Sequence, residues 1–243
     1  MRSTAGSTEP TGARAPAVLP ERRAEVRRFG RVTRLVHRTT GYLMLLCGAT
    51  ASSLYVAPLA QLVGRRELMV TLHEWSGILL PVPLLLGTLS PEFRADLRRL
   101  NRFAAYDREW LWAVVKRWAS PGARPAGKFN AGQKLYAGWI AGAVLVMMTT
   151  GLLMWFTRVL PAVSRTSAIF VHDCLAWVLV IVLYAHMRKA AKDPEARRGM
   201  RTGFVSRTWA RREHSRWLAE EAEEAGASQM GRPSNDPGPR AES

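Results

Sequence analysis

The fold is decided by the apolar stretch IFVHDCLAWVLVIVLYAHM, residues 169–187, which carries His172 near one end and His186 near the other. At about 1.5 Å of rise per residue the two imidazoles lie about 21 Å apart on a helix, and about 100° of rotation per residue returns them close to one face. Ionisable residues are rare inside apolar spans and indicate a functional site where they occur. One helix therefore directs two candidate ligands to two separate levels of the protein.

Long apolar runs identify the chain as a membrane protein. Its mean hydropathy is only -0.08, because polar ends and a long polar loop dilute the apolar runs. Each run has about 20 residues, which is enough to cross a hydrocarbon core of about 30 Å. The sequence predicts an all-α membrane protein, a bundle of four transmembrane helices with spans near residues 35–56, 68–89, 135–156 and 168–187.

The net charge of +16 is compatible with nucleic-acid binding, but the positions of the basic residues indicate a membrane orientation instead. Arginines and lysines cluster before the first span, in the loop between the second and third, and after the fourth. The remaining two loops carry little basic charge beyond Arg65, Arg66, Arg158 and Arg165. By the positive-inside rule both termini are cytoplasmic, and the basic side chains face anionic lipid head groups. We predict a multi-pass membrane protein with no nucleic-acid partner.

The polar ends predict disorder in residues 1–22 and 226–243, on either side of one membrane domain over residues 23–225. Within that domain, residues 92–103 and 108–118 predict amphipathic helices on the cytoplasmic surface. The expected interface anchors there are Trp110, Trp112 and Trp118.

The segment after the fourth span also predicts a surface helix. Trp209 and Trp217 are its expected interface anchors, and we expect His214 to be solvated.

The histidines of the spans fall at two depths. The first span carries His37 at its cytoplasmic end, and the second runs inward and carries His73 near the outer surface. His73 therefore shares a level with His172, and His37 shares one with His186. A lone histidine in a span is more often a hydrogen-bonded core residue, whereas two pairs of neutral imidazoles suit axial ligation of heme iron. A single shared metal is disfavoured, since the levels are about 21 Å apart and zinc needs three or four converging ligands.

Small residues follow each of these histidines four positions later, namely Gly41, Gly77, Ala176 and Ala190. Residues four apart share a helix face, so a small side chain leaves room for a flat macrocycle beside the ligand. Small residues are also common wherever transmembrane helices pack closely. We predict heme packing at Gly41 and Gly77.

Three further features lie in or near the spans. Cys47 and Cys174 form no CxxC or CxxCH motif, so we expect two buried small hydrophobes and no covalent heme attachment. The Pro81-Val82-Pro83 stretch predicts a kink in the second span, below the helical part that carries His73. Before the third span, Asn130 and Gln133 form either an N-cap with its reciprocal partner or an amide pair that binds a quinone carbonyl.

Motifs along the chain, in order, are RxxH before the first span, HxxxG in the second, GKFNAGQK, TTGLLMW, VHDCLAWVLVIVLYAH and GFVSRTWARREHSRW. With these motifs the chain resembles the gamma subunit of membrane-bound formate dehydrogenases, a four-helix diheme cytochrome b of the bacterial cytoplasmic membrane. The resemblance extends from about Val26 to Ala225. The sequence departs from the family at Arg38, where an aromatic residue is more usual, and at the two prolines of the second span.

The resemblance implies an outer heme b held by His73 and His172 and an inner heme b held by His37 and His186. It also implies that electrons arrive from an iron-sulfur subunit and a molybdopterin catalytic subunit on the outer side. Menaquinone or another quinone is then reduced near Asn130, Gln133 and His186.

We therefore predict an electron-transfer subunit with no substrate chemistry of its own beyond the quinone site. The alternative is a heme-free membrane anchor or small transporter whose histidines relay protons or bind a transition metal.

Overall fold

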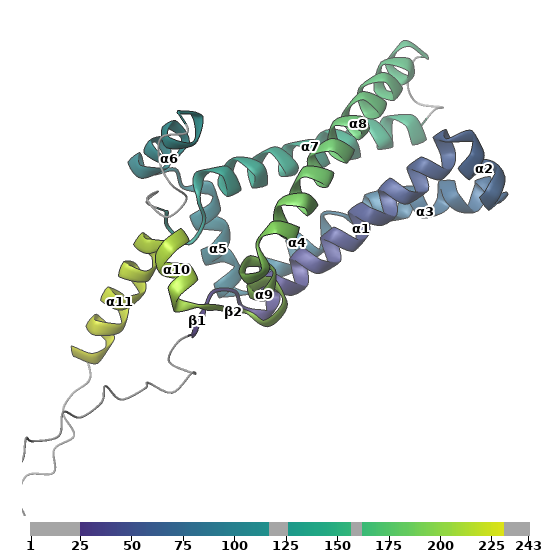
Figure 1. Cartoon of the computed structure of the whole chain (residues 1–243). Coiled ribbons are helices and arrows are strands. Elements are labelled where there is room, and N and C mark those ends of the chain that lie inside the picture. The colour runs from purple at the N-terminus through teal and green to yellow at the C-terminus, as the bar shows by residue number, and fades with distance from the viewer. Residues whose placement is uncertain (1–24, 117–125, 157–161, 231–243) are drawn as a thin grey trace, which may run out of the picture.

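The structure, a computed structural model, describes residues 25–116, 126–156 and 162–230, and nearly all of its regular elements are helices (Figure 1). In chain order the elements are β1 (Glu25–Arg27), α1 (Arg31–Tyr55), α2 (Ala57–Val63), α3 (Arg66–Leu79), α4 (Val82–Gly87), α5 (Pro91–Asn101), α6 (Ala105–Val115), α7 (Ala131–Trp155), α8 (Ala162–Lys192), α9 (Pro194–Thr202), β2 (Phe204–Ser206), α10 (Arg207–Glu213) and α11 (Ser215–Met230).

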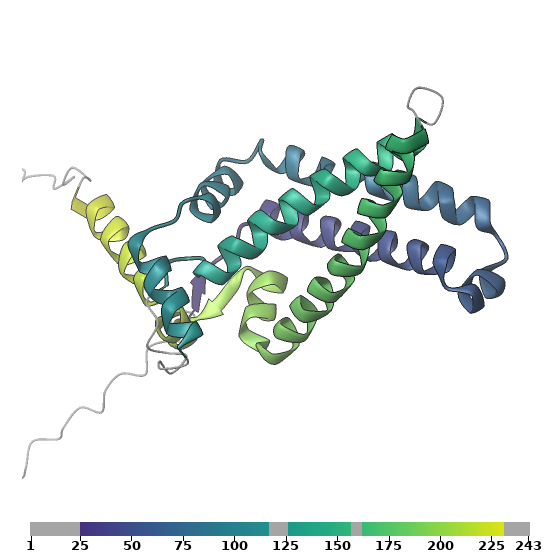
Figure 2. The same ribbon diagram turned by 90° about the horizontal axis from the view of Figure 1, so that it is seen from above.

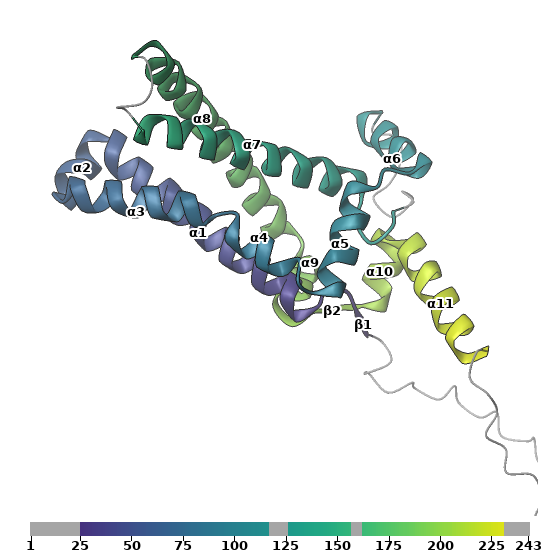
Figure 3. The same ribbon diagram turned by 180° about the vertical axis from the view of Figure 1, so that it is seen from behind.

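Two antiparallel pairs make up the bundle. Helix α1 packs against α3 and α4, and α7 packs against α8. The short helices α5, α6, α10 and α11 and the β1–β2 ribbon gather at one end of the bundle, and α2 lies at the other (Figures 1 and 3). Seen from above, the two long pairs lie side by side and diverge toward that other end (Figure 2). The first and last described segments therefore lie at the same end.

Among the described residues, three helical segments are long and apolar enough to cross a membrane, namely Arg66–Gly87, Ala131–Trp155 and Arg165–Lys192. A fourth is present if α1 and α2 are counted as one span bent by 101°. The prediction of an all-α membrane protein is confirmed.

The breaks in these spans follow the sequence. Helix α1 ends at Tyr55, the next residue Val56 has an extended backbone, and α2 starts anew with Pro58 in its first turn. The second span is interrupted after α3, at Leu80 and Pro81, because proline lacks the N–H that the helix ladder requires. The predicted local opening of the second span is present as this interruption, and the part that carries His73 is regular helix.

A small hydrophobic core closes the end of the bundle where both terminal segments meet. Strand β1 pairs antiparallel with β2, with Val26 opposite Val205. Val205 packs with Trp209, Ala210 and Trp217. The expectation that both tryptophans anchor the protein in lipid is wrong, because their side chains are only 6% and 0% exposed. Periodicity shows that a helix has an apolar face, but not whether protein or lipid covers that face.

His214 lies in the same region and is buried rather than solvated, which corrects the second expectation for this segment. Its Nδ1 lies 2.7 Å from the Gly127 carbonyl oxygen, and its Nε2 lies 2.9 Å from a terminal guanidinium nitrogen of Arg28. Burial, and secondly the charge of Arg28, lower the pKa of His214 to about 3. The ring is neutral at pH 7 and joins the C-terminal segment to the segment before α7.

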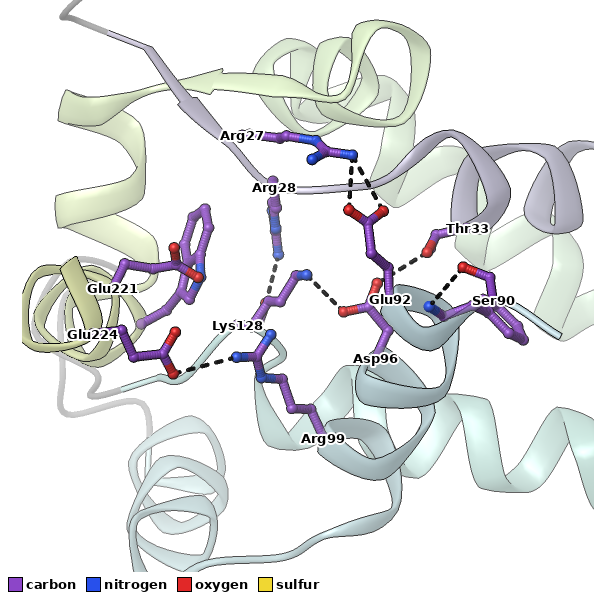
Figure 4. Close-up of polar contacts among 12 residues, drawn as sticks. Arg27, Arg28, Thr33, Ser90, Glu92, Asp96, Arg99, Lys128, Glu221 and Glu224 are labelled. Atoms are coloured by element: carbon purple, nitrogen blue, oxygen red, sulfur yellow. Dashed lines mark hydrogen bonds and ion pairs between the residues drawn. The ribbon is translucent and has the colours of Figure 1, made fainter. Parts of the chain in front are cut away.

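Polar contacts attach the loop helices to the bundle (Figure 4). Asp96 of α5 accepts hydrogen bonds from Thr33 at 3.0 Å and from Lys128 at 2.6 Å. Lys134 of α7 and Asp107 of α6 form a buried ion pair at 2.7 Å. The two predicted loop helices are present as α5 and α6, and both lie against protein as well as facing outward.

Of the tryptophans expected to anchor the loop, Trp112 is 58% exposed, as an interface anchor requires. The ring of Trp110 instead packs on the start of α7 near Gly132. Trp118 lies outside the described residues, as do residues 1–22 of the expected N-terminal tail. Helix α11 continues to Met230, beyond the boundary predicted at residue 225.

Candidate functional site

Two histidine pairs lie between the long helices, one pair at each level. His73 of α3 faces His172 of α8, with ring centroids 6.2 Å apart. His37 of α1 faces His186 of α8, also with centroids 6.2 Å apart. Helix α8 thus contributes one ring to each pair, and its two histidines are separated by about 21 Å of helix rise.

The spacing within each pair fits axial ligation of one metal by two imidazoles. Metal–nitrogen bonds of about 2 Å, with about 1.2 Å from each nitrogen to its ring centre, place the centroids of opposed ligands about 6.4 Å apart. Both observed separations agree with this value to within a few tenths of an ångström. In the described part of the chain, no three His, Cys, Asp or Glu side chains converge as a non-heme metal site would require.

The glycines predicted to accommodate a macrocycle leave space around the histidines. A Cβ atom added at Gly41 or Gly77 would meet no heavy atom within 4 Å, and the same holds at Gly138 and Gly142 of α7. A Cβ at Gly151 would lie 3.6 Å from Cε1 of His172. The positions beside Gly41 and Gly77 are thus open, and heme packing there stays a prediction.

The outer histidines are held by hydrogen bonds that sequence reasoning missed. Nδ1 of His73 lies 3.1 Å from the Thr50 hydroxyl and 3.1 Å from the Cys47 carbonyl oxygen. Nδ1 of His172 lies 2.8 Å from the Thr150 hydroxyl. In the sequence, these hydrogen bonds could have been predicted from a threonine within an apolar span, near the depth of each outer histidine.

The inner pair has a different environment. The ring of Tyr136 stacks on His186, with centroids 4.9 Å apart and planes inclined by 10°. Tyr136 lies three residues after Gln133 on α7, so the two residues share a helix face. The first turns of α7 therefore lie beside the inner pair.

Asn130 and Gln133 form the predicted N-cap of α7. The Asn130 side-chain oxygen accepts from the Gln133 backbone N–H at 2.9 Å, and the Gln133 side-chain oxygen accepts from the Asn130 backbone N–H at 3.0 Å. The capping box is confirmed. It uses the two amide oxygens and none of the amide N–H donors, so capping and hydrogen bonding to a quinone carbonyl are compatible.

The two cysteines differ in their burial. Cys47 is half-buried, and its Sγ lies 3.1 Å from the Ser76 hydroxyl. Cys174 is exposed on a face of α8 that the described residues leave uncovered, so the expectation of a side chain buried within the protein is wrong there. Both are free thiols, as the absence of a CxxC motif predicts.

Comparison with known families identifies this arrangement. Residues 28–225 match the family described as prokaryotic cytochrome b561. The chain belongs to this family. Membership implies heme b and a multi-pass protein of a bacterial membrane, and it confirms the family resemblance inferred from the sequence motifs.

Individual relatives are cytochrome subunits of formate dehydrogenases. The chain is 32% identical over 97 residues to the nitrate-inducible formate dehydrogenase cytochrome b556(Fdn) subunit of Escherichia coli K12, covering 39% of this chain and 45% of that subunit. It is 31% identical over 98 residues to the Haemophilus influenzae cytochrome b556 subunit, covering 39% of this chain and 41% of the relative. It is 24% identical over 208 residues to the E. coli K12 cytochrome b556(fdo) subunit, covering 82% of this chain and 95% of the relative. The two matches of higher identity thus span less than half of each relative's length.

Proposed function

We propose that this chain is a diheme cytochrome b subunit that passes electrons between an outer-side oxidoreductase and the quinone pool at the cytoplasmic side. The names of this chain's relatives support an outer partner similar to formate dehydrogenase. In this proposal the partner consists of an iron-sulfur subunit fed by a molybdopterin catalytic subunit. The observation that carries the proposal is the presence of two histidine pairs, each with centroids 6.2 Å apart, on two levels of one bundle.

Each pair would hold one heme b through its two imidazoles. His73 and His172 hold the outer group, and His37 and His186 hold the inner one. Bound heme iron supplies one-electron transfer at each level. The protein's own contribution is to fix the two levels about 21 Å apart on α8.

At the inner level, the start of α7 provides the quinone site. The amide N–H donors of Asn130 and Gln133 hydrogen-bond a quinone carbonyl, while their oxygens cap the helix. Tyr136 links this turn to His186 by stacking. The orientation that places this level and both termini in the cytoplasm is supported by the basic residues that cluster in the segments at that end.

The alternative, a heme-free anchor or transporter, explains the pairs less well. Proton relay does not require opposed imidazoles at a metal-ligand spacing on both levels. A transition-metal site needs three or four ligands at one point, and the described residues bring histidines together only in twos.

Heme content of the purified chain tests the proposal. A reduced-minus-oxidised spectrum should show a bis-histidine b-type signal, and the ratio of heme to chain should be two. His172→Ala should leave only the inner heme and His186→Ala only the outer one, so each variant serves as the other's control. Absence of a heme signal, or loss of both hemes from either single variant in a folded protein, refutes the two-level arrangement.

The quinone site is tested by a substitution that keeps the helix-capping role of Asn130 but removes its hydrogen-bond donors to the quinone. Asn130→Ser retains an N-cap oxygen but removes the amide donors. The rate of quinone reduction should then fall at low concentrations of a menaquinone analogue, with both hemes retained. Asn101→Ser, the same change on exposed α5, is the matched control. Equal quinone kinetics in the two variants would contradict the assignment.

A further inference from the structure

Two threonines hold the outer histidines in the same way. In both cases the contact joins the threonine hydroxyl to Nδ1, at 3.1 Å for Thr50 with His73 and 2.8 Å for Thr150 with His172. Both threonines are buried, with exposed fractions of 3% and 7%. Each lies on the first helix of an antiparallel pair and contacts a histidine on the second.

The hydrogen bonds of each threonine to its own helix determine which atom donates in its contact with the histidine. The Thr50 hydroxyl donates to the carbonyls of Leu46 and Cys47, at 2.8 and 3.0 Å. The Thr150 hydroxyl donates to the carbonyls of Val146 and Met147, at 2.8 and 3.1 Å. A hydroxyl has one proton, so its oxygen is left to accept from the histidine.

These hydrogen bonds fix His73 and His172 in one tautomer. An oxygen that accepts from Nδ1 requires the proton to be on Nδ1, and the Cys47 carbonyl beside His73 imposes the same requirement. The lone pair then lies on Nε2, on the far side of the ring. Metal-ligating histidines are commonly held in this way, with one nitrogen bonded to the protein and the other to the metal.

The repetition of the contact argues against coincidence. The partners are 23 residues apart in one pair and 22 in the other, and the two contacts lie in different helix pairs, α1 with α3 and α7 with α8. Beside Thr150, Cε1 of His172 would lie 3.6 Å from a Cβ atom added at Gly151, which is an ordinary van der Waals contact. Two different helix pairs thus reach the same local geometry at the same depth.

The inner pair lacks this support. Within residues 25–116, 126–156 and 162–230, no threonine hydroxyl is hydrogen-bonded to the ring of His37 or His186. His186 is held by stacking on Tyr136 instead. The two levels therefore differ in how their ligands are fixed.

We propose that Thr50 and Thr150 are positioning residues for the outer heme, each orienting one axial histidine through Nδ1 and raising its basicity as an iron ligand. The proposal rests on the proposed function, in which these histidines ligate heme. Loss of such a partner commonly lowers metal affinity by about 10- to 100-fold. The effect is confined to the outer level.

Valine substitutions provide the test, because valine keeps the shape of threonine without the hydroxyl. Thr50→Val and Thr150→Val are compared with Thr149→Val and Thr39→Val. The Thr149 and Thr39 hydroxyls donate to carbonyls of their own helices and contact no histidine among the described residues. The measurements are hemin affinity of the apo-protein and the midpoint potential and EPR spectrum of each heme. Thr50→Ser and Thr150→Ser, which retain the hydroxyl, should restore wild-type values.

We expect about 10- to 100-fold weaker retention of the outer heme in Thr50→Val and Thr150→Val. The outer signal should shift, and the inner heme and both control variants should be unchanged. Outer-heme properties equal to those of Thr149→Val overturn the inference, as does an equal disturbance of both hemes. Wild-type protein without two hemes refutes the proposed function itself, so the two failures are distinguishable.

Discussion

Acidification should destabilise the small core formed by Val205, Trp209, Ala210 and Trp217 through one residue, His214. Its Nδ1 donates to the Gly127 carbonyl, and its Nε2 accepts from Arg28. Both contacts require the neutral ring, because a protonated Nε2 would point an N–H at a guanidinium that only donates. Burial, followed by the charge of Arg28, lowers the pKa of His214 from 6.5 to about 3.

The direction and size of the stability change follow from the difference between the folded and unfolded pKa of His214. Because the folded pKa lies below the unfolded value, the unfolded chain binds the proton first as the pH falls. Stability is fully present above pH 6.5 and is lost progressively as the pH falls toward 3. One pH unit corresponds to about 1.4 kcal/mol, so acidification from pH 6.5 to 5 should cost about 2 kcal/mol.

Hydrogen exchange followed by mass spectrometry measures this opening directly. Peptides covering residues 204–218 should show a free energy of opening that falls by about 2 kcal/mol over this range in the wild type, after correction for intrinsic exchange. His214→Gln should start less stable, since it keeps only part of the hydrogen bonding, but should show a much flatter dependence on pH. Equal pH slopes for the wild type and His214→Gln would refute the assignment, whatever their absolute stabilities.

Three substitutions test the packing around the site. Trp217→Ala should cost about 3–5 kcal/mol of unfolding free energy in the small core, because the side chain is fully buried there. Lys134→Ala should cost about 3–5 kcal/mol, since it leaves Asp107 buried without its charge partner, and Lys134→Met with Asp107→Asn should recover most of that loss. Gly87→Ala should cost about 1–3 kcal/mol, because its Cβ would lie 2.7 Å from a methyl group of Val36. Thermal denaturation in detergent measures each effect, and a change below about 0.5 kcal/mol would contradict the corresponding reasoning.

Much of the fold could be predicted from the sequence because its main determinants are periodic. Long apolar runs give the spans, Pro81 gives the break in the second span, and Asn130 with Gln133 gives the start of α7. The pairing of histidines by depth follows from helix rise and the alternating direction of successive spans. These are local properties of each helix and do not depend on its contacts with distant segments.

The remaining features depend on contacts between distant segments. Trp209 and His214 lie in a stretch whose amphipathic pattern fits a lipid surface equally well, and only the pairing of β2 with β1 shows that protein covers them. Thr50 and Thr150 are equally ambiguous in sequence, because threonines in apolar helices usually bond their own backbone. Both do so here and also accept from a histidine on the neighbouring helix.

The two levels of the bundle differ in the contacts that hold their histidines in place. At the outer level, hydrogen bonds from neighbouring transmembrane helices fix the histidines individually. At the inner level, Tyr136 stacks on His186, and the helix that carries Tyr136 is itself held by the segment before it. Arg28 donates to the Lys128 carbonyl and His214 to that of Gly127, just before Asn130. Because the first and last described segments both contact this turn, the position of Tyr136 beside His186 depends on the folding of that end of the bundle, whereas Thr50 and Thr150 contact His73 and His172 from within the long helices.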